Sequence, residues 1–448
     1  MDTNALMMET TAHRKLFHSY LFPAMLGMVL MAINILIDGL FVSHGVGEIG
    51  LAAINIAVPI FSIIISISLW IGIGGATLYS ISLGKKDVNR AKQIFTHAIV
   101  LTLLLTTIVL GTFLLFQRQF AYLFGANDHV LPYVEGYLHI ILLFGIVYVL
   151  ENILSIFIRN DGNPQLAMFG LITTSVVNII LNYVFILQLD WGVEGAAYAT
   201  VYSTIVGVIV MLTHFLKKDK NLGLRFTKID FSIYKNILAI GLPSFIVEGS
   251  TAIMMIGFNI TFNHYLGDTG VVAYAVVNYM HTVFLMLFIG VGMAIQPITS
   301  YHHGAGLNER NRLFVKIAVQ TGFVIGLIVL FAGIIGQNGI IKMFAVSTPE
   351  AISFTKTGIM YFFLGYLFLG VNIVFIEFYQ SVEKIRLALW FVVSRSFIFF
   401  LPLLWLLPKL FGPNAIWLAF PLAELLTTMF IFTQLRYRMR STKTMNEW

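Results

Sequence analysis

The chain repeats one pattern of residues with an offset of about 220 positions. When Pro23 is placed on Pro243, the run Gly47–Ala53 falls on Gly267–Ala273. Small slips bring two further runs into register: Gly72-Ile73-Gly74 onto Gly290-Val291-Gly292, and Gly84, Asp87, Asn89 and Arg90 onto Gly306, Glu309, Asn311 and Arg312. A repeat of fixed period is highly constraining, because each copy must form the same structural unit. The chain is therefore predicted to fold as two related halves.

The composition indicates that a lipid bilayer surrounds most of the chain. Of its 448 residues, 58% are hydrophobic and 11% are charged, and the mean hydropathy is +0.88. Soluble domains contain about 25% charged residues, so this chain could not cover its core with polar surface in water. Several stretches without Asp, Glu, Lys or Arg exceed the ~20 residues that span hydrocarbon: 51–83, 93–117, 165–189 and 317–341. We therefore expect an all-α integral membrane protein.

Hydropathy and turn residues predict twelve transmembrane helices. They are expected at 17–41, 52–83, 93–117, 132–158, 164–189, 195–216, 235–263, 271–301, 313–337, 354–380, 385–408 and 414–435. If the N-terminus is cytoplasmic, 22 of the 27 Lys and Arg residues fall on the inner side. The positive-inside rule then predicts that both termini are cytoplasmic. The rule also accounts for the net charge of +6, so we do not expect nucleic-acid binding.

A basic connection at the chain midpoint separates six predicted helices from six. We expect an N-terminal six-helix lobe at 1–216, a cytoplasmic linker at 217–234, a C-terminal six-helix lobe at 235–437 and a basic tail at 438–448. Because six is even, both halves enter the bilayer from the same side, so the repeats are parallel. In membrane proteins, two related halves place a binding site at their interface, which favours a transporter.

Polar residues at bilayer depth are costly, so they are candidates for function. Asn34 and Asp38 lie one helical turn apart, as do Asn178 and Asn182, and Thr200 falls on the following helix. Residues four apart share a helix face, so these side chains could form an oxygen-rich pocket. A carboxylate there could bind a proton or Na⁺, or could attract a cationic substrate. The alternative is that Asp38 faces water at the helix end.

Four glutamates and an arginine are also predicted to lie within helices. Glu248 follows Pro243 in an apolar run, and it is either a coupling residue or a structural partner of Arg395. Glu151 is a further intramembrane carboxylate. We expect Glu377 and Glu424, near inner helix ends, to pair with cations of the loops. Pro23 and Pro243 occupy matching places in the first helix of each half, which predicts a matched kink.

The sequence shows no pattern typical of an enzyme or a cofactor site. It contains no cysteine, no H-E-x-x-H, no G-x-x-x-x-G-K-[ST] and no G-x-S-x-G. The histidines have no metal-ligand spacing, and His302-His303 is expected in a loop. We therefore expect no enzyme activity, no metal site beyond a possible Na⁺ at Asp38, Asn178 and Asn182, and no cofactor. Without a nucleotide site, an ion gradient is the expected energy source.

Taken in order, the motifs resemble those of the multidrug and toxic compound extrusion (MATE) family. The resemblance covers nearly the whole chain and is carried by these runs: Asp38 followed by Gly47-x-x-Gly50-Leu51-Ala52-Ala53, Gly72-Ile73-Gly74, Leu83-Gly84-Lys85-Lys86-Asp87, Arg159-Asn160-Asp161-Gly162-Asn163-Pro164, Gly192-Val193-Glu194-Gly195-Ala196-Ala197, Gly241-Leu242-Pro243-Ser244-Phe245 and Gln296-Pro297. The run at 159–164 resembles the corresponding run in the branch of the family that includes bacterial multidrug exporters of the DinF type.

The resemblance implies two six-helix lobes around a V-shaped cleft and alternating-access antiport of H⁺ or Na⁺ against organic cations. Its helix 1 aspartate and kink proline fall on Asp38 and Pro23, and its helix 7 glutamate falls on Glu248. Its helix 5 Asn-x-x-x-Asp pair falls on Asn178 and Asn182, so one carboxylate is replaced by an amide. That replacement weakens the case for Na⁺ and gives more weight to Asp38.

We expect a monomer in the plasma membrane whose partners are organic cations and membrane lipids. The nearest rival is a flippase or exporter of lipid-linked precursors or metabolites with the same fold. That rival predicts several basic residues for a pyrophosphate in the cleft, whereas only Arg395 is expected at bilayer depth. A channel or membrane sensor is disfavoured by the two-lobe repeat, and a membrane enzyme by the missing catalytic motifs.

Overall fold

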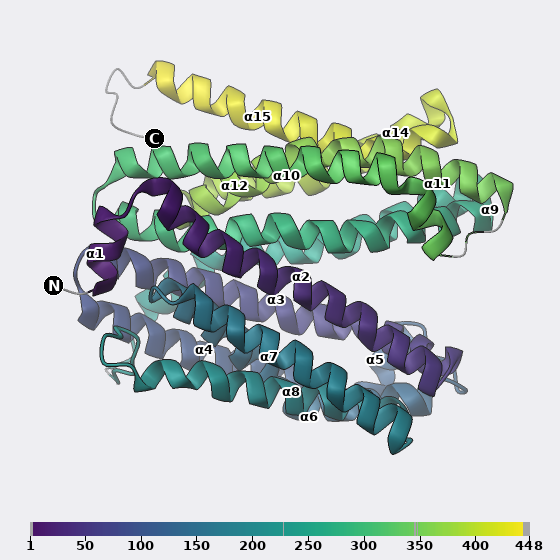
Figure 1. The fold of residues 1–448 in the computed structure, drawn as a ribbon, viewed down its shortest axis with the longest axis horizontal. Helices are drawn as coiled ribbons and strands as arrows, with labels where there is room; N and C mark the ends of the chain where they lie inside the picture. Colours follow the sequence, from purple (N-terminus) through teal and green to yellow (C-terminus); the bar gives the residue numbers. More distant parts are fainter. Residues whose placement is uncertain (1–2, 227, 345, 347, 442–448) are drawn as a thin grey trace. The chain divides into compact units, whose positions relative to one another are not determined.

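The computed structural model describes residues 3–226, 228–344, 346 and 348–441, and the protein is drawn in Figure 1. Within this part the regular elements are helical. The last residues of the predicted basic tail, 442–448, lie outside the described residues. The α-helices are α1 (Thr3–Thr10), α2 (His13–Gly45), α3 (Glu48–Gly84), α4 (Val88–Leu115), α5 (Gln117–Leu123), α6 (Leu131–Asn160), α7 (Pro164–Asn182), α8 (Gly192–Leu212), α9 (Phe231–Gly304), α10 (Asn308–Met343), α11 (Pro349–Phe362), α12 (Tyr366–Ser381), α13 (Ile385–Val393), α14 (Phe400–Phe411) and α15 (Ala419–Ser441).

Short 3₁₀ and π segments join several of these helices into longer spans. They are η1 (Tyr183–Gln188), η2 (Thr213–Leu216), η3 (Phe363–Gly365), η4 (Ser394–Phe399) and η5 (Pro413–Leu418). Within the described residues, 11 helical segments are long and apolar enough to cross a bilayer. One of them, α9, has 74 residues and contains Gly267 at φ 56° and ψ −144°, so it is two helices joined at a glycine. The predicted twelve-helix arrangement is therefore confirmed.

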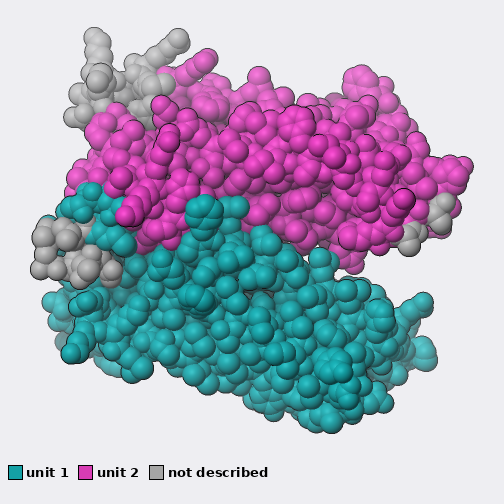
Figure 2. Space-filling model, viewed as in Figure 1, with its two compact units in different colours: residues 1–11, 22–245 teal, residues 12–21, 246–448 magenta. Residues whose placement is uncertain are grey.

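The described chain forms two compact units, coloured separately in Figure 2. Unit 1 comprises residues 1–11 and 22–245, and unit 2 comprises residues 12–21 and 246–448. Two of the three boundaries, after residues 21 and 245, fall next to the two prolines that the sequence repeat aligns: Pro23 lies inside α2, and Pro243 lies inside α9. Whether these prolines kink their helices during a functional cycle stays a prediction.

In unit 1, glycines allow α3 to approach the beginning of α9 at backbone distance. A Cβ atom on Gly74 would lie 2.0 Å from the carbonyl oxygen of Ile237, and one on Gly241 would lie 1.7 Å from that of Trp70. The Trp70 indole Nε1 donates a hydrogen bond of 2.7 Å to the Leu238 carbonyl oxygen. Small residues at helix contacts in membranes act in this way, because dispersion contacts increase as backbones approach.

The run at 159–164 also has a structural role in unit 1. The buried Asp161 carboxylate accepts hydrogen bonds of 2.8 Å from the Tyr79 hydroxyl and from His214 Nε2. It also accepts from the backbone N–H groups of Asn221, at 3.2 Å, and Leu222, at 3.1 Å. One side chain thus joins the ends of α3, α6 and α8 to the basic connection that follows η2.

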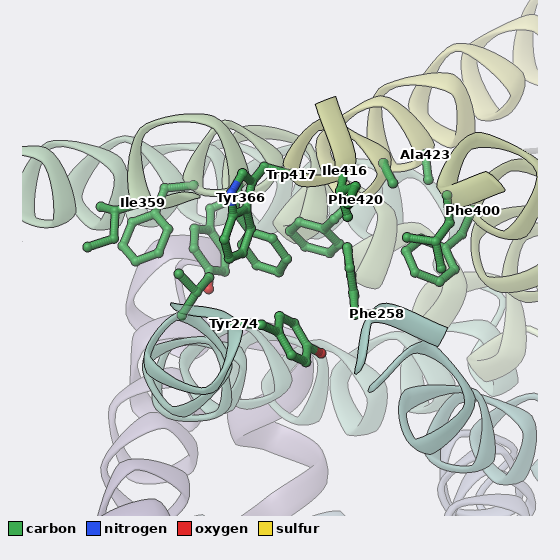
Figure 3. Close-up of a cluster of buried hydrophobic side chains, with 14 of the residues drawn as sticks. Phe258, Tyr274, Ile359, Tyr366, Phe400, Ile416, Trp417, Phe420 and Ala423 are labelled. Carbon is green, nitrogen blue, oxygen red and sulfur yellow. The ribbon is translucent and has the colours of Figure 1, made fainter. Parts of the chain in front are cut away.

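Unit 2 is built around a cluster of buried aromatic side chains, shown in Figure 3. Trp417 packs on Phe262 with ring centroids 4.4 Å apart, and Phe420 stacks on Phe362 at the same distance. Tyr366, from the start of α12, stacks on Phe288 at 5.7 Å. Aromatic pairs add about 0.5–1.5 kcal/mol each beyond area burial, so this cluster ties α9, α11, α12 and η5 together.

Candidate functional site

The predicted polar residues of the first half meet around Asp38 in unit 1. Asn182 Nδ2, at the end of α7, donates to Asp38 Oδ1 at 2.5 Å and to Asn178 Oδ1 at 2.9 Å. Asn34 Nδ2, one turn earlier on α2, lies 3.4 Å from Asp38 Oδ2. Asn178 Nδ2 reaches Thr200 Oγ1 on α8 at 3.5 Å. Three helices therefore contribute to one cluster that contains a single carboxylate.

Local helix geometry explains why these residues meet. Side chains four apart lie on one face of a helix, so α2 presents Asn34 with Asp38, and α7 presents Asn178 with Asn182. Asn182 is the last residue of α7, and the π segment η1 begins at the next residue. Such π turns are often found at functional sites, because they change the direction in which side chains leave the helix.

Two oxygen atoms of this cluster have no hydrogen-bond donor in the described part of the chain. They are the buried Oδ1 atoms of Asn34 and Asn182, which belong to the two amides that contact Asp38. Leaving a buried acceptor unpaired costs about 1–3 kcal/mol. A proton on Asp38, a water molecule or a bound cation would each supply the missing partner. The arrangement is suited to exchanging such a partner.

A second carboxylate in unit 1 lies on the same side of α7. Glu151 of α6 is buried, with 2% of its surface exposed, and accepts a hydrogen bond from Thr174 Oγ1. Gly207 of α8 leaves the space for this contact, since a Cβ there would lie 1.9 Å from Thr174 Oγ1. Sequence reasoning identified Glu151 as intramembrane but missed Thr174 and Gly207. The available signal was that Thr174 precedes Asn178 by one turn.

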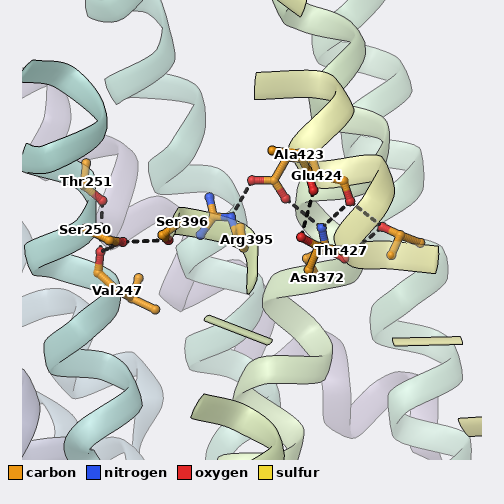
Figure 4. Close-up of polar contacts among 10 residues, drawn as sticks. Val247, Ser250, Thr251, Asn372, Arg395, Ser396, Ala423, Glu424 and Thr427 are labelled. Carbon is orange, nitrogen blue, oxygen red and sulfur yellow. Dashed lines mark hydrogen bonds and ion pairs between the residues drawn. The ribbon is translucent and has the colours of Figure 1, made fainter. Parts of the chain in front are cut away.

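In unit 2, the structure contradicts two predicted pairings. Arg395, in the π segment η4, forms a buried ion pair with Glu424 of α15, whose side chain is 1% exposed (Figure 4). Arg395 is therefore not the partner of Glu248, and Glu424 does not pair with a loop cation. Asn372 Nδ2 also donates to Glu424 Oε2 at 2.7 Å, and Thr428 Oγ1 donates to Asn372 Oδ1 at 2.8 Å.

The other glutamates of unit 2 have fewer polar contacts. Glu248 is half-buried on α9, and within the described chain it makes no hydrogen bond or ion pair. The prediction that Glu377 pairs with a loop cation is wrong for the described residues. Its side chain instead packs against Gly292, where a Cβ would lie 2.9 Å from Glu377 Cγ. A role of Glu248 in coupling stays a prediction.

The histidine pair also differs from its prediction. His302 and His303 lie in the last turn of α9 rather than in a loop. His302 Nδ1 lies 2.7 Å from the Ile298 carbonyl oxygen, and its Nε2 accepts from Arg310 Nε at 3.1 Å. Among the described residues, no group of three or more His, Cys, Asp or Glu side chains could hold a metal ion.

Comparisons with known proteins agree with this architecture. The MatE family model matches the chain twice, at residues 23–184 and 243–406. The multidrug export protein MepA of Staphylococcus haemolyticus (strain JCSC1435) is 24% identical, with 96% of this chain and 95% of that protein covered. MepA of Staphylococcus aureus (strain N315) is 25% identical, with 96% and 94% covered.

Solved structures show the same fold. A MATE crystal structure in the bent conformation has a TM-score of 0.90 at 22% identity, covering 98% of each chain. A MOP superfamily transporter from Pyrococcus furiosus Vc1 (DSM3638) has a TM-score of 0.92 at 21% identity, covering 99% of this chain and 100% of that one. Because the two family matches together span most of the sequence, this multi-pass membrane protein belongs to the MatE family.

Proposed function

We propose that the protein is a secondary active exporter that moves organic cations out of the cell in exchange for H⁺, with Na⁺ as the alternative coupling ion. The observation that carries the proposal is the Asp38 cluster: one carboxylate, held by two amides and without an ion pair in the described part of the chain, next to two unpaired buried oxygens. The names of the MepA relatives, multidrug export proteins, support the same activity.

The chemistry follows from competition for one negative charge. An ionised Asp38 attracts a cationic substrate, whereas a protonated Asp38 is neutral and releases it. Because the same carboxylate cannot hold both partners at full strength, binding of one favours loss of the other. This mutual exclusion couples two gradients through alternating access, in which α2 bends at Pro23 and α9 bends at Pro243. No cofactor and no catalytic residue are required.

The amide at position 182 supports H⁺ over Na⁺. Asn182 Nδ2 already donates to Asp38 Oδ1 and to Asn178 Oδ1, and a Na⁺ ion would have to displace these contacts. Protonation of Asp38 requires no such displacement, and the new O–H group could donate to one of the unpaired amide oxygens. A Na⁺ site at Asp38, Asn178 and Asn182 would require rotation of the Asn182 amide.

The remaining parts of the proposal concern placement. We infer a monomer in the plasma membrane, with both termini in the cytoplasm, lobes at 1–216 and 235–437, and the basic connection 217–234 on the inner side. The substrate contacts would come from small organic cations, and lipids would surround the helices. The ion pair of Arg395 with Glu424 disfavours the rival lipid-precursor flippase, because this arginine is not available for a pyrophosphate.

Transport in liposomes tests the proposal. The purified full-length protein is reconstituted, and ethidium movement is followed with a pH gradient or a Na⁺ gradient imposed separately. We expect movement driven by the pH gradient and its loss in Asp38→Asn, while Glu48→Gln, an exposed carboxylate of the same unit, transports normally. Unchanged transport in Asp38→Asn would refute the role of Asp38. Drive by Na⁺ alone would select the alternative ion, and movement with neither would favour a lipid or metabolite substrate.

A further inference from the structure

One face of α7 connects two carboxylates of unit 1, the half-buried Asp38 and the buried Glu151. Thr174, Asn178 and Asn182 are spaced four residues apart, so their side chains follow one another along the helix. Asn182 contacts Asp38 at one end of this row, and Thr174 contacts Glu151 at the other. The row spans about 12 Å, because each helical residue rises about 1.5 Å.

Glu151 lies among neutral groups. The side chain that binds it is Thr174, and the backbone of Gly207 closes the space beside it. The sequence of α7 contains no charged residue, and α3 and α8 contain one each, Glu48 and Glu194, close to their first residues. An ionised carboxylate buried in this way is costly, so a bound proton would stabilise it for part of any cycle.

Charged residues on the other neighbouring helices lie well away along the chain. On α6 itself, Arg159 is two turns further and lies 3.3 Å from Ser155 Oγ, while Glu135 and His139 are three or more turns earlier. On α4, the titratable and charged residues Arg90, Lys92 and His97 all lie within its first ten residues. Glu151 is therefore free to change its protonation state without breaking an ion pair.

We propose that Glu151 is a second proton-carrying residue, connected to Asp38 along the Thr174–Asn178–Asn182 face of α7. The inference rests on the proposed H⁺ antiport at Asp38. A proton leaves the Asp38 carboxyl group and passes through water held along this face. Thr174 Oγ1 then accepts it while giving its own hydroxyl proton to the Glu151 carboxylate. Asp38 ends ionised and Glu151 ends neutral, so charge and atoms balance.

Distances and direction fit this transfer. Asn182 and Asn178 are joined directly by a hydrogen bond of 2.9 Å. The next step, from Asn178 to Thr174, joins side chains one turn apart, whose Cβ atoms lie about 5–6 Å from each other, a gap that one bridging water can span. Asp38 lies in the last third of α2, and Glu151 lies in the last third of α6. With cytoplasmic termini, α2 runs outward and α6 runs inward, so the two residues lie in opposite halves of the bilayer. The row along α7 thus carries the proton inward.

Infrared spectroscopy of the detergent-purified full-length protein tests the inference without substrate or gradient. The band of protonated carboxyl groups is recorded as pH is changed, for the unaltered protein, Glu151→Gln, Asp38→Asn and the matched control Glu48→Gln. We expect Glu151→Gln to remove one pH-dependent band that the control retains. Asp38→Asn should shift the midpoint of that band by up to about one pH unit, the shift expected if the two charges are separated by the length of the α7 row, about 12 Å.

Two results would overturn the proposal: a Glu151→Gln spectrum that matches the unaltered protein, or a midpoint that Asp38→Asn leaves unchanged. If Glu151→Gln does not fold, Thr174→Val keeps both carboxyl groups and removes the donor. This variant should change the frequency of the Glu151 band, and an unchanged frequency would refute the link to α7. Because the spectra require no transport, the two proposals can fail separately. If ethidium export depends on Asp38 but the spectra show no band that Glu151→Gln removes, only the present inference is refuted.

Discussion

The two halves of the chain place different chemistry at equivalent positions inside their helix bundles. The turns Asp161-Gly162-Asn163 and Val382-Glu383-Lys384 have the same backbone hydrogen bonds, with Gly162 at φ 84° and Glu383 at φ 59°. The two turns are therefore 221 residues apart. This offset lies between those of the two family matches, whose first residues, 23 and 243, are 220 apart and whose last residues, 184 and 406, are 222 apart. It places Glu151 on Asn372, and Thr174 on Arg395. Unit 1 thus has an uncharged donor beside its carboxylate, whereas unit 2 has an arginine.

The difference separates a carboxylate whose neighbour is an uncharged hydroxyl from one whose neighbour is a buried cation. In unit 2, the buried Arg395 guanidinium lies against the Glu424 carboxylate, and removal of either charge would leave the other buried without compensation. In unit 1, Glu151 can bind or lose a proton without abandoning an ion pair. Under the antiport proposed above, Asp38 and Glu151 of unit 1 would exchange protons, whereas the Arg395–Glu424 pair holds helices of unit 2 together.

The largest expected effect comes from breaking the ion pair of unit 2. Arg395→Leu would leave Glu424 buried without its cation, which costs about 3–5 kcal/mol of stability. Thermal unfolding in detergent measures this loss. The double variant Arg395→Leu with Glu424→Leu should recover most of it, because paired burial is costly to begin with. A single variant as stable as the unaltered protein would show that Glu424 can become neutral, and the contrast between the units would fail.

The next effect comes from filling the space beside Glu151. In Gly207→Ala, the new Cβ would lie 1.9 Å from Thr174 Oγ1 and 2.5 Å from Glu151 Oε1. Overpacking of this kind costs about 1–3 kcal/mol. Gly111→Ala is the matched control, because no atom lies within 4 Å of a Cβ at that position. Equal stability of the two variants would mean that α8 does not close against this pair.

The same chemical change should have unequal effects in the two units. Glu151→Gln keeps an acceptor for Thr174, so the loss of stability should stay within the ~1 kcal/mol of a typical hydrogen bond. Glu424→Gln should cost about 3–5 kcal/mol, because Arg395 stays buried without its carboxylate. Unfolding midpoints of the two purified variants provide the comparison. Similar losses would place Glu151 in a structural role like that of Glu424.

The smallest effect concerns a surface pair of unit 1. The Arg90 guanidinium, 3.2 Å from Asp230, lowers the pKa of that carboxyl below its usual 3.8, with the Ser232 N–H acting in the same direction. The pair therefore contributes stability above about pH 4, and this contribution is lost as pH falls through the lowered pKa. Asp230→Asn should remove this dependence in unfolding measurements at low salt. Persistence of the same acid dependence would assign it to another group.

In unit 2 the corresponding arginine, Arg312, pairs with Glu309 three residues earlier on its own helix. Asp230 lies in the connection 217–234, so its pair with Arg90 joins this connection to α4. Glu309→Gln breaks a pair within one helix and leaves that contact intact, which makes it the control for Asp230→Asn. Both pairs are partly exposed and therefore screened by salt, so both effects should weaken at high ionic strength.

The sequence predicted the membrane spans well, because uninterrupted apolar runs and flanking charges are strong signals. The Asp38 cluster was also predictable, since a polar side chain in such a run stands out and the four-residue spacing defines a face. The pairing of Arg395 with Glu424 was not, because it depends on which helices become neighbours. Thr174 was missed because threonine is common in membrane helices, and Gly207 because its role is to leave space.

The division of the chain into units has a consequence for any attempt to separate its halves. Residues 12–21 belong to unit 2, although the rest of α2 belongs to unit 1, and the first residues of α9 belong to unit 1. Each half of the sequence thus contributes a short segment to the unit that is formed mainly by the other half. Neither half, expressed alone, would contain all of its own unit. Synthesis must therefore reach residue 246 and beyond before residues 12–21 find their final neighbours.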